Sequence, residues 1–214
     1  MNATIPAYIL AGGRSSRFGS DKALACLDSI PLAKRLADRL AKICSSVTIV
    51  TRQGERYDEL TTRSIEDEFE FLGPMAGVIR ALQDTVSREN RESWTLVTSC
   101  DLLEWHDAWY ERMIQAVREE ANQDRSPHVA AFHTAEKRWQ PFPGLYHVAL
   151  LPIANELLNR GQRSMQMLLN HVNANTLSVS FERLPDIRSA NTHQELRAWV
   201  ALRGPNPLKN DPSQ

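Results

Sequence analysis

The sequence contains little cysteine, and none of it lies in a pattern that binds metal or builds a disulfide framework. Its three cysteines, Cys26, Cys44 and Cys100, form no C-x-x-C pair, and the six histidines lack metal-ligand spacing. A zinc site or a disulfide-stabilised secreted domain is therefore not expected. The odd, sparse count of cysteines instead indicates reduced thiols in a cytoplasm.

Long apolar runs and a strong excess of one charge are also missing. No stretch approaches the roughly 18 apolar residues of a membrane span, and the N-terminal segment lacks the basic and apolar regions of a signal peptide. The 25 lysines and arginines nearly balance the 26 aspartates and glutamates. We therefore expect a cytoplasmic protein that binds neither nucleic acid nor membrane, and in which local charge captures any anionic ligand.

Short apolar runs alternate with amphipathic segments along much of the 214-residue chain. Strands are expected at 7–10, 47–51, 64–68, 94–101, 128–134 and 176–184, and helices at 31–44, 73–86, 104–121, 149–161, 163–172 and 191–203. The segment 140–146 is broken by prolines and is left without a strand or helix. The alternation predicts an α/β fold with a mostly parallel, doubly wound sheet and helices on both faces. We expect one domain over residues 1–203 and a disordered tail at 204–214.

The stretch LAGGRSSRFGSDKA, residues 10–23, follows the first expected strand. Gly12 and Gly13 have no Cβ, so the backbone can turn sharply and its N–H groups can approach an anion closely. Three cations against one aspartate leave a local charge of +2 over residues 14–22. This composition favours a triphosphate ligand, although an exposed basic turn would show it too. The spacing matches neither a Walker loop nor a dinucleotide fingerprint.

A second unusual stretch, TSCD at 98–101, closes a strongly apolar strand. A carboxylate in this position lies at the edge of a parallel sheet where ligands bind, so Asp101 should face the same cleft as the glycine loop. A bound triphosphate brings Mg²⁺, which needs only one or two protein carboxylates. Asp101 is therefore the candidate metal ligand, and the alternative is that it caps the following helix.

With these pieces in order, the sequence resembles the molybdenum cofactor guanylyltransferase family of nucleotidyltransferases. The family carries a pattern close to LAGG-x-S-x-R-M-G-x-D-K-A, and this chain has Phe18 in place of the methionine. Further matches follow in chain order: PL at 31–32, IED at 65–67, GPMAG at 73–77, CD at 100–101, QPFPGLY at 140–146, LLNRGQRSMQMLL at 157–169 and NTHQEL at 191–196. The resemblance spans residues from about 7 to about 200.

The resemblance implies a Rossmann-like α/β fold, with GTP as nucleotide and Mg²⁺ as metal. It implies transfer of GMP to the terminal phosphate of Mo-molybdopterin, with release of pyrophosphate and formation of the guanine dinucleotide cofactor. The expected nucleotide-binding residues are Leu10, Ala11, Gly12, Gly13, Lys22, Asp67 and Asp101.

The expected catalytic groups are Lys22, Arg17 and Asp101. The two cations, together with Mg²⁺ on Asp101, would stabilise charge on the departing pyrophosphate. On the acceptor side the resemblance indicates Arg163 and Asn191. The family often has N-x-N-T where this chain has Ser189 in place of the first asparagine, and capping of the last helix is the alternative role for Asn191.

Other functions share these motifs. A related nucleotidyltransferase could use CTP or another NTP with a molybdopterin, isoprenoid or sugar-phosphate acceptor. A non-catalytic nucleotide-binding protein is a further alternative, although Lys22 and Asp101 are both present. Proteins that deliver or accept the cofactor are also possible partners.

Overall fold

The computed structural model describes residues 5–12, 21–54, 57, 60, 63–69, 72–88, 93–121, 128–133, 138–172, 176–180 and 184–203. The expectations for Gly13, Arg17 and the tail at 204–214 fall outside these residues.

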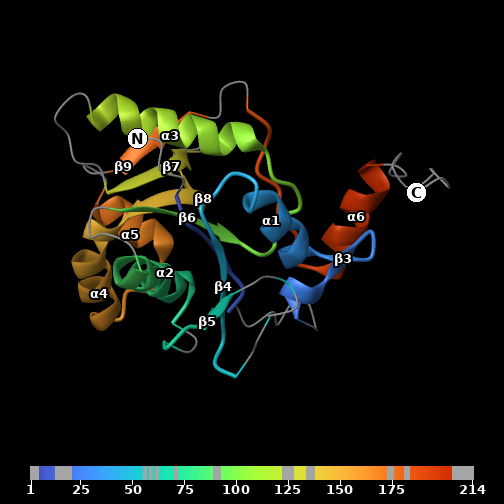
Figure 1. The fold of residues 1–214 in the computed structure, drawn as a ribbon, viewed down its shortest axis with the longest axis horizontal. Coiled ribbons are helices and arrows are strands. Elements are labelled where there is room, and N and C mark those ends of the chain that lie inside the picture. The colour runs from blue at the N-terminus through green and yellow to red at the C-terminus, as the bar shows by residue number, and fades with distance from the viewer. Residues whose placement is uncertain are drawn as a thin grey trace.

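A seven-stranded sheet forms the centre of the fold, in the order β5-β4-β1-β6-β8-β7-β9 (Figure 1). Its strands are β1 (Ala7–Leu10), β4 (Val47–Thr51), β5 (Ser64–Glu66), β6 (Trp94–Ser99), β7 (Val129–His133), β8 (Trp139–His147) and β9 (Thr176–Val179). All pairings in this sheet are parallel except those that β8 makes with β6 and β7. The predicted mostly parallel sheet is thus confirmed, with one antiparallel strand in the segment that the prolines had left unassigned.

Helices cover both faces of the sheet (Figure 1). They are α1 (Leu32–Leu40), α2 (Pro74–Arg88), α3 (Asp107–Ala121), α4 (Leu151–Asn159), α5 (Met165–His171) and α6 (His193–Arg203). The apolar sides of α1 and α3 form one core cluster with Ile9 and Leu96. Those of α2, α4 and α5 form a second cluster with Tyr8 and Val97. Adjacent strand residues therefore enter opposite cores, which is why β1 and β4 are apolar on both faces.

A small third cluster lies beside α6 and the hairpin formed by β2 (Cys26–Leu27) and β3 (Ile30–Pro31). The hairpin turn has positive φ angles at Asp28 and Ser29, 55° and 67°, as expected for a tight turn between two antiparallel strands. Leu27 of β2 packs in this cluster with Leu196 of α6. The end of the described chain is thereby held against residues that follow the glycine loop.

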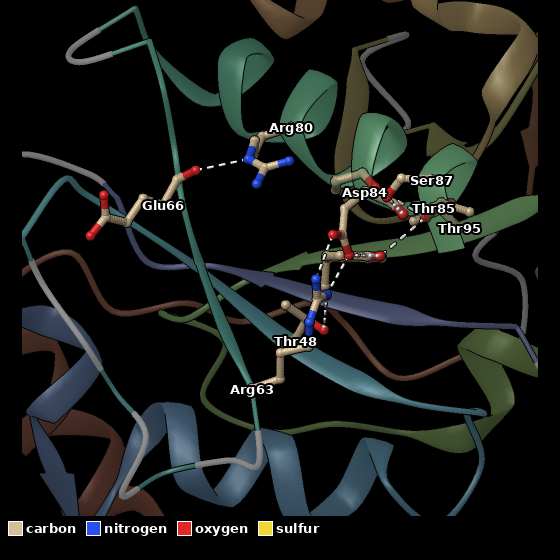
Figure 2. Close-up of polar contacts among 10 residues, drawn as sticks. Thr48, Arg63, Glu66, Arg80, Asp84, Thr85, Ser87 and Thr95 are labelled. Atoms are coloured by element: carbon tan, nitrogen blue, oxygen red, sulfur yellow. Dashed lines mark hydrogen bonds and ion pairs between the residues drawn. The ribbon is translucent and has the colours of Figure 1, made fainter. Parts of the chain in front are cut away.

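A buried polar network ties α2 to the sheet (Figure 2). Both Nη atoms of Arg63 donate to the carboxylate of Asp84, and the Tyr8 hydroxyl donates to Asp84 Oδ2 at 2.7 Å. The Thr85 hydroxyl contacts the Tyr8 hydroxyl at 3.3 Å, and the Thr95 hydroxyl donates to Thr85 Oγ1 at 3.0 Å. Burial alone would raise the pKa of Asp84, but the hydrogen bonds from Arg63 and Tyr8 outweigh it and lower the pKa.

The strand order creates a topological switch point between β1 and β6. From β1 the chain moves to β4 and β5 on one side, and then crosses to β6 on the other. Just beyond these strands, the Cys100 N–H donates to the carbonyl of Leu10 at 3.1 Å, which holds the two strand ends together. Ligands of doubly wound sheets bind at such a point. Within the described ranges, no helix is both long and apolar enough to cross a membrane.

Candidate active site

Lys22 and Asp101 form an ion pair at the switch point. Lys22 Nζ lies 2.6 Å from Asp101 Oδ2, with the side chains only 14% and 18% exposed. Lys22 begins the short 3₁₀ helix η1 (Lys22–Leu24), whose N-cap Asp21 accepts from the Ala23 N–H at 2.9 Å. The Tyr57 hydroxyl donates to the other oxygen of Asp21. The cap therefore fixes the backbone from which Lys22 reaches the end of β6.

Asp101 is held by its backbone at the end of β6. Its carbonyl accepts from the Ala190 N–H at 3.0 Å, and the Leu103 N–H donates to the Arg188 carbonyl at 2.9 Å. An isolated antiparallel bridge joins Leu102 to Ser189. The alternative role of Asp101 as a helix cap is wrong, because α3 begins only at Asp107.

Asn191 completes the cluster, since its Oδ1 accepts from Lys22 Nζ at 3.0 Å. Capping is not its role: α6 begins at His193, and Thr192 Oγ1 accepts the Glu195 N–H at 3.1 Å. Thr192 is therefore the N-cap. The structure brings together two candidates that were assigned to opposite substrates, Lys22 for the nucleotide and Asn191 for the acceptor.

The candidate residues after β1 lie beside this cluster. The Ala11 N–H donates to the carbonyl of Val50 at 2.8 Å, which continues the β1–β4 ladder past Leu10. A Cβ built on Gly12 would lie 3.7 Å from Arg52 Cγ, an ordinary van der Waals distance. Packing within the described residues therefore does not require glycine here, and the close approach of a ligand remains its predicted purpose. Arg52 is a cation beside the loop that sequence reasoning left unassigned.

Asp67 follows β5, two strands away from β1 in the same sheet. Its N–H donates to the Thr51 carbonyl at 2.8 Å, and its Oδ1 accepts from the Phe69 N–H at 3.0 Å. Nearby, the Arg80 side chain holds the Glu66 carbonyl at 2.8 Å (Figure 2). Burial raises the pKa of Asp67. Among the described residues, no hydrogen bond or ion pair joins Asp67 to Lys22 or Asp101.

Arg163 lies beside Gly73, just before the start of α2. Its carbonyl oxygen is 3.4 Å from a Cβ built on Gly73, whose φ of +84° also favours glycine. The described residues show no hydrogen bond or ion pair between Arg163 and Asn191. The two acceptor candidates are thus not brought together directly.

A cavity of about 860 Å³ opens next to Asp101. It is bounded by the end of β6 at 98–99, the start of β8 with Arg138, Gln166 of α5, and the segment 187–191 that carries Asn191. Sequence reasoning missed Arg138 and Gln166. Arg138 is recognisable only as the cation before a strand that was not predicted.

The cavity opens where β8 is not paired with β6. Only the C-terminal half of β8 pairs with β6, and the first residues of β8 do not. The β6–β8 pairing ends at Val97–Gly144, whereas the β7–β8 pairing resumes at Phe132–Gln140. Residues 141–143 therefore form a bulge in β8, which contains the cis peptide bond Phe142–Pro143. Proline lacks the N–H that a central strand needs, so it fits at a bulge.

Two residues of QPFPGLY hold this bulge in place. The Tyr146 hydroxyl donates to the Pro141 carbonyl at 2.6 Å. A Cβ built on Gly144 would lie only 2.6 Å from the same carbonyl oxygen, so a side chain there would displace the bulge. Gln166 fixes the start of β8. Its Oε1 accepts from the Trp139 N–H at 3.2 Å, and its Nε2 donates to the Trp139 carbonyl at 2.6 Å.

The chemistry of the cluster fits Mg²⁺ only together with a phosphate ligand. No group of three or more His, Cys, Asp or Glu residues in the described ranges could hold a metal ion by itself. Asp101 Oδ2 and Asn191 Oδ1 do converge on one cation, the Lys22 ammonium. Mg²⁺ commonly takes one or two protein ligands and completes its octahedron with phosphate oxygens and water.

Comparison with known proteins identifies the family of this chain. A family model described as "MobA-like NTP transferase domain" matches residues 7–176. A probable molybdenum cofactor guanylyltransferase of Nostoc sp. is 31% identical over 198 residues, covering 90% of this chain and 88% of the relative. The molybdenum cofactor guanylyltransferase of Serratia proteamaculans is 27% identical, covering 95% and 98%.

Among solved structures, molybdopterin-guanine dinucleotide biosynthesis protein A from Archaeoglobus fulgidus superposes with a TM-score of 0.73. It is 16% identical, and the match covers 93% of this chain and 98% of that one. At this identity the likeness supports the Rossmann-like fold alone. The family model and the curated relatives go further: this chain belongs to the MobA-like NTP transferase family and is a nucleotidyltransferase.

Proposed function

We propose that this enzyme transfers GMP from GTP to the terminal phosphate of Mo-molybdopterin, and so makes the guanine dinucleotide form of the molybdenum cofactor. The observation that carries the proposal is the Lys22–Asp101–Asn191 cluster, which lies between the glycine-loop strand β1 and the cavity beside β6. Two substrates can thus meet at one point, one from each side. The names of the relatives at 27–31% identity supply the choice of guanine nucleotide and molybdopterin.

On the nucleotide side, the backbone of Leu10, Ala11 and Gly12 would bind GTP, with Gly13 continuing the loop. Lys22 would contact its phosphates, with Arg17 as a second cation. Asp67 at the edge of β5 stays a predicted nucleotide contact.

Mg²⁺ is proposed to bind at Asp101, with Asn191 as a neighbouring oxygen donor. When bound, it would neutralise charge on the triphosphate and on the departing pyrophosphate. Lys22, whose Nζ contacts the same two oxygens in this structure, would contact the phosphates and stabilise the same developing charge.

On the acceptor side, the cavity of about 860 Å³ is within the range of small-molecule sites. Arg138 offers a cation for the acceptor phosphate, and Asn191 links this space to the nucleotide side. Arg163 stays a predicted acceptor contact. An oxygen of the acceptor phosphate would attack the α-phosphorus of GTP, forming one P–O bond as the bond to pyrophosphate breaks. Because that phosphate is already ionised near neutral pH, positioning and charge stabilisation suffice and a strong general base is unnecessary.

The test is a transfer assay with the purified protein, Mg²⁺ and Mo-molybdopterin, run separately with GTP, CTP and ATP. We expect release of pyrophosphate with GTP and a guanine dinucleotide product in the mass spectrum. A preference for CTP would overturn the assignment of the nucleotide. Binding of GTP without any transfer would favour the non-catalytic alternative.

The controls are omission of the acceptor and replacement of Mg²⁺ by EDTA. Pyrophosphate release that did not depend on the acceptor would contradict a transferase and indicate hydrolysis. A cytoplasmic location and the proteins that deliver or accept the cofactor stay predictions.

A further inference from the structure

We propose that Glu195 is a positioning residue for the catalytic cluster, acting through Asn191. This inference rests on the proposed transfer reaction but concerns a residue that is not among the proposed substrate contacts. It explains how the Asn191 side chain is held in contact with Lys22.

The geometry begins with the backbone of Asn191. The Glu195 carboxylate accepts the Asn191 N–H at 2.5 Å, while the Glu195 N–H donates to Thr192 Oγ1 at 3.1 Å. The two bonds resemble a capping box, in which the glutamate three residues after the cap reaches back to the cap's own N–H. Here the carboxylate reaches one residue further, to Asn191. The first turn of α6 therefore fixes the residue whose side chain accepts from Lys22.

The other side of Asn191 is fixed by pairing with the end of β6. The Ala190 N–H donates to the Asp101 carbonyl at 3.0 Å, and the Leu102–Ser189 bridge continues the pairing. Ala190 is fully buried in the small cluster with Leu103 and Leu196. Asn191 thus stands between a segment paired with Asp101 and a helix start controlled by Glu195.

These contacts fix the hydrogen bond between Asn191 and Lys22. With both neighbours fixed, Asn191 Oδ1 meets Lys22 Nζ at 3.0 Å, and the same nitrogen meets Asp101. Loss of the Glu195 carboxylate frees the Asn191 backbone on the helix side and leaves its N–H without that partner. Lys22 then loses the Asn191 oxygen that helps to orient it between nucleotide and acceptor.

The kinetic test is a double-mutant cycle in the transfer assay. We expect Glu195→Ala to lower kcat/KM about 10- to 100-fold, as typical for residues that orient a catalytic group. Glu195→Gln keeps an accepting oxygen and should restore wild-type rates. Asn191→Ala should cost at least as much as Glu195→Ala, because it also removes the proposed oxygen donor beside Mg²⁺, and the double variant should cost no more than Asn191→Ala alone.

The matched control is Gln194→Ala, an exposed neighbour on the same turn, with expected wild-type kinetics. Additive losses in the double variant would overturn the proposal, because Glu195 would then act independently of Asn191. The same holds if Glu195→Ala matched the control.

A second readout does not depend on activity. In ¹⁵N NMR spectra, the side-chain amide resonance of Asn191 should move in Lys22→Ala, because its carbonyl loses the ammonium. We expect Glu195→Ala to move it similarly, and Glu195→Gln and Gln194→Ala to leave it in place. An unmoved resonance in Glu195→Ala would contradict the positioning role even if the enzyme proved to use another acceptor. Absence of transfer by the wild type would instead contradict the proposed function.

Discussion

Lys22 and Asp101 meet at 2.6 Å although 79 residues separate them in the chain. One stands at the end of the glycine loop and the other at the end of β6. Their contact joins the two motifs that are proposed to bind the nucleotide. The contribution of this ion pair to kcat can be compared with that of an exposed ion pair in the same protein.

Replacement of either partner by alanine should abolish transfer while leaving the fold intact. We expect Lys22→Ala and Asp101→Ala to lose about a hundredfold or more in kcat, since each removes charge stabilisation of the leaving group. Steady-state kinetics at saturating GTP and Mg²⁺ measure this loss, and far-UV circular dichroism monitors the fold. The control is Lys34→Ala, whose exposed pair with Asp38 at 2.7 Å lies on one face of α1. Full activity in Lys22→Ala or Asp101→Ala would be incompatible with the assigned roles.

The bulge of β8 should control acceptor binding. Tyr146→Phe removes the donor to the Pro141 carbonyl, so we expect a loss of about 1–3 kcal/mol in the free energy of unfolding. It should also raise KM for the acceptor while leaving KM for GTP unchanged. Gly144→Ala should raise the acceptor KM by a different route, through the 2.6 Å clash with the same carbonyl.

The control for the bulge is Tyr110→Phe on α3. Tyr110 hydrogen-bonds with the Ile5 backbone and does not line the cavity. Tyr110→Phe should lower the free energy of unfolding without changing KM for the acceptor or for GTP. Equal effects of both tyrosine variants on the acceptor KM would argue against a specific role for the bulge.

The buried network around Asp84 should make the stability depend on pH. The hydrogen bonds from Arg63 and Tyr8 outweigh burial, so the folded protein lowers the pKa of Asp84. The ionised carboxylate therefore stabilises the fold above the unfolded pKa of about 3.9, and this contribution is lost as the pH falls below it.

Urea unfolding from about pH 6 down to about pH 3 measures this contribution. We expect the stability difference between wild type and Asp84→Asn to shrink as the pH falls. Asp38→Asn, in the exposed pair with Lys34, serves as a control with little pH-dependent difference. A difference for Asp84→Asn that stayed constant with pH would show that the charge of Asp84 does not contribute.

The cysteines should react unequally with thiol reagents. Cys44 and Cys100 are buried, and burial raises the pKa of each to about 12, whereas Cys26 is exposed. Because the thiolate is the reactive form, we expect rapid labelling of Cys26 alone in the native protein and of all three after denaturation. Mass spectrometry identifies the labelled sites.

Cys100→Ala should retain the transfer activity, since its thiol packs beside Asp101 without entering the chemistry. Rapid native labelling of Cys100, or a large loss of kcat in the alanine variant, would contradict this.

Local pattern alone determined much of this protein. The apolar runs at 7–10 and 94–101 predict buried strands, and β1 and β6 occupy adjacent positions in the sheet. Glycines after the first run and Asp101 after the second then mark the ligand edge. The strand predictions succeed because side-chain periodicity is a property of neighbouring residues, whereas the ligand edge stays a prediction.

Only the tertiary structure decided the cavity beside Asp101, which is the proposed acceptor site. The prolines in 140–146 prevented the prediction of β8, because proline lacks the N–H that strand pairing needs. The strand forms here because β6 and β7 flank it and the prolines lie in a bulge. Likewise Asn191 resembled a helix cap, and only the pairing of 188–190 with the end of β6 turns its side chain to Lys22. Contacts between residues far apart in the chain depend on register and packing, which local sequence patterns do not encode.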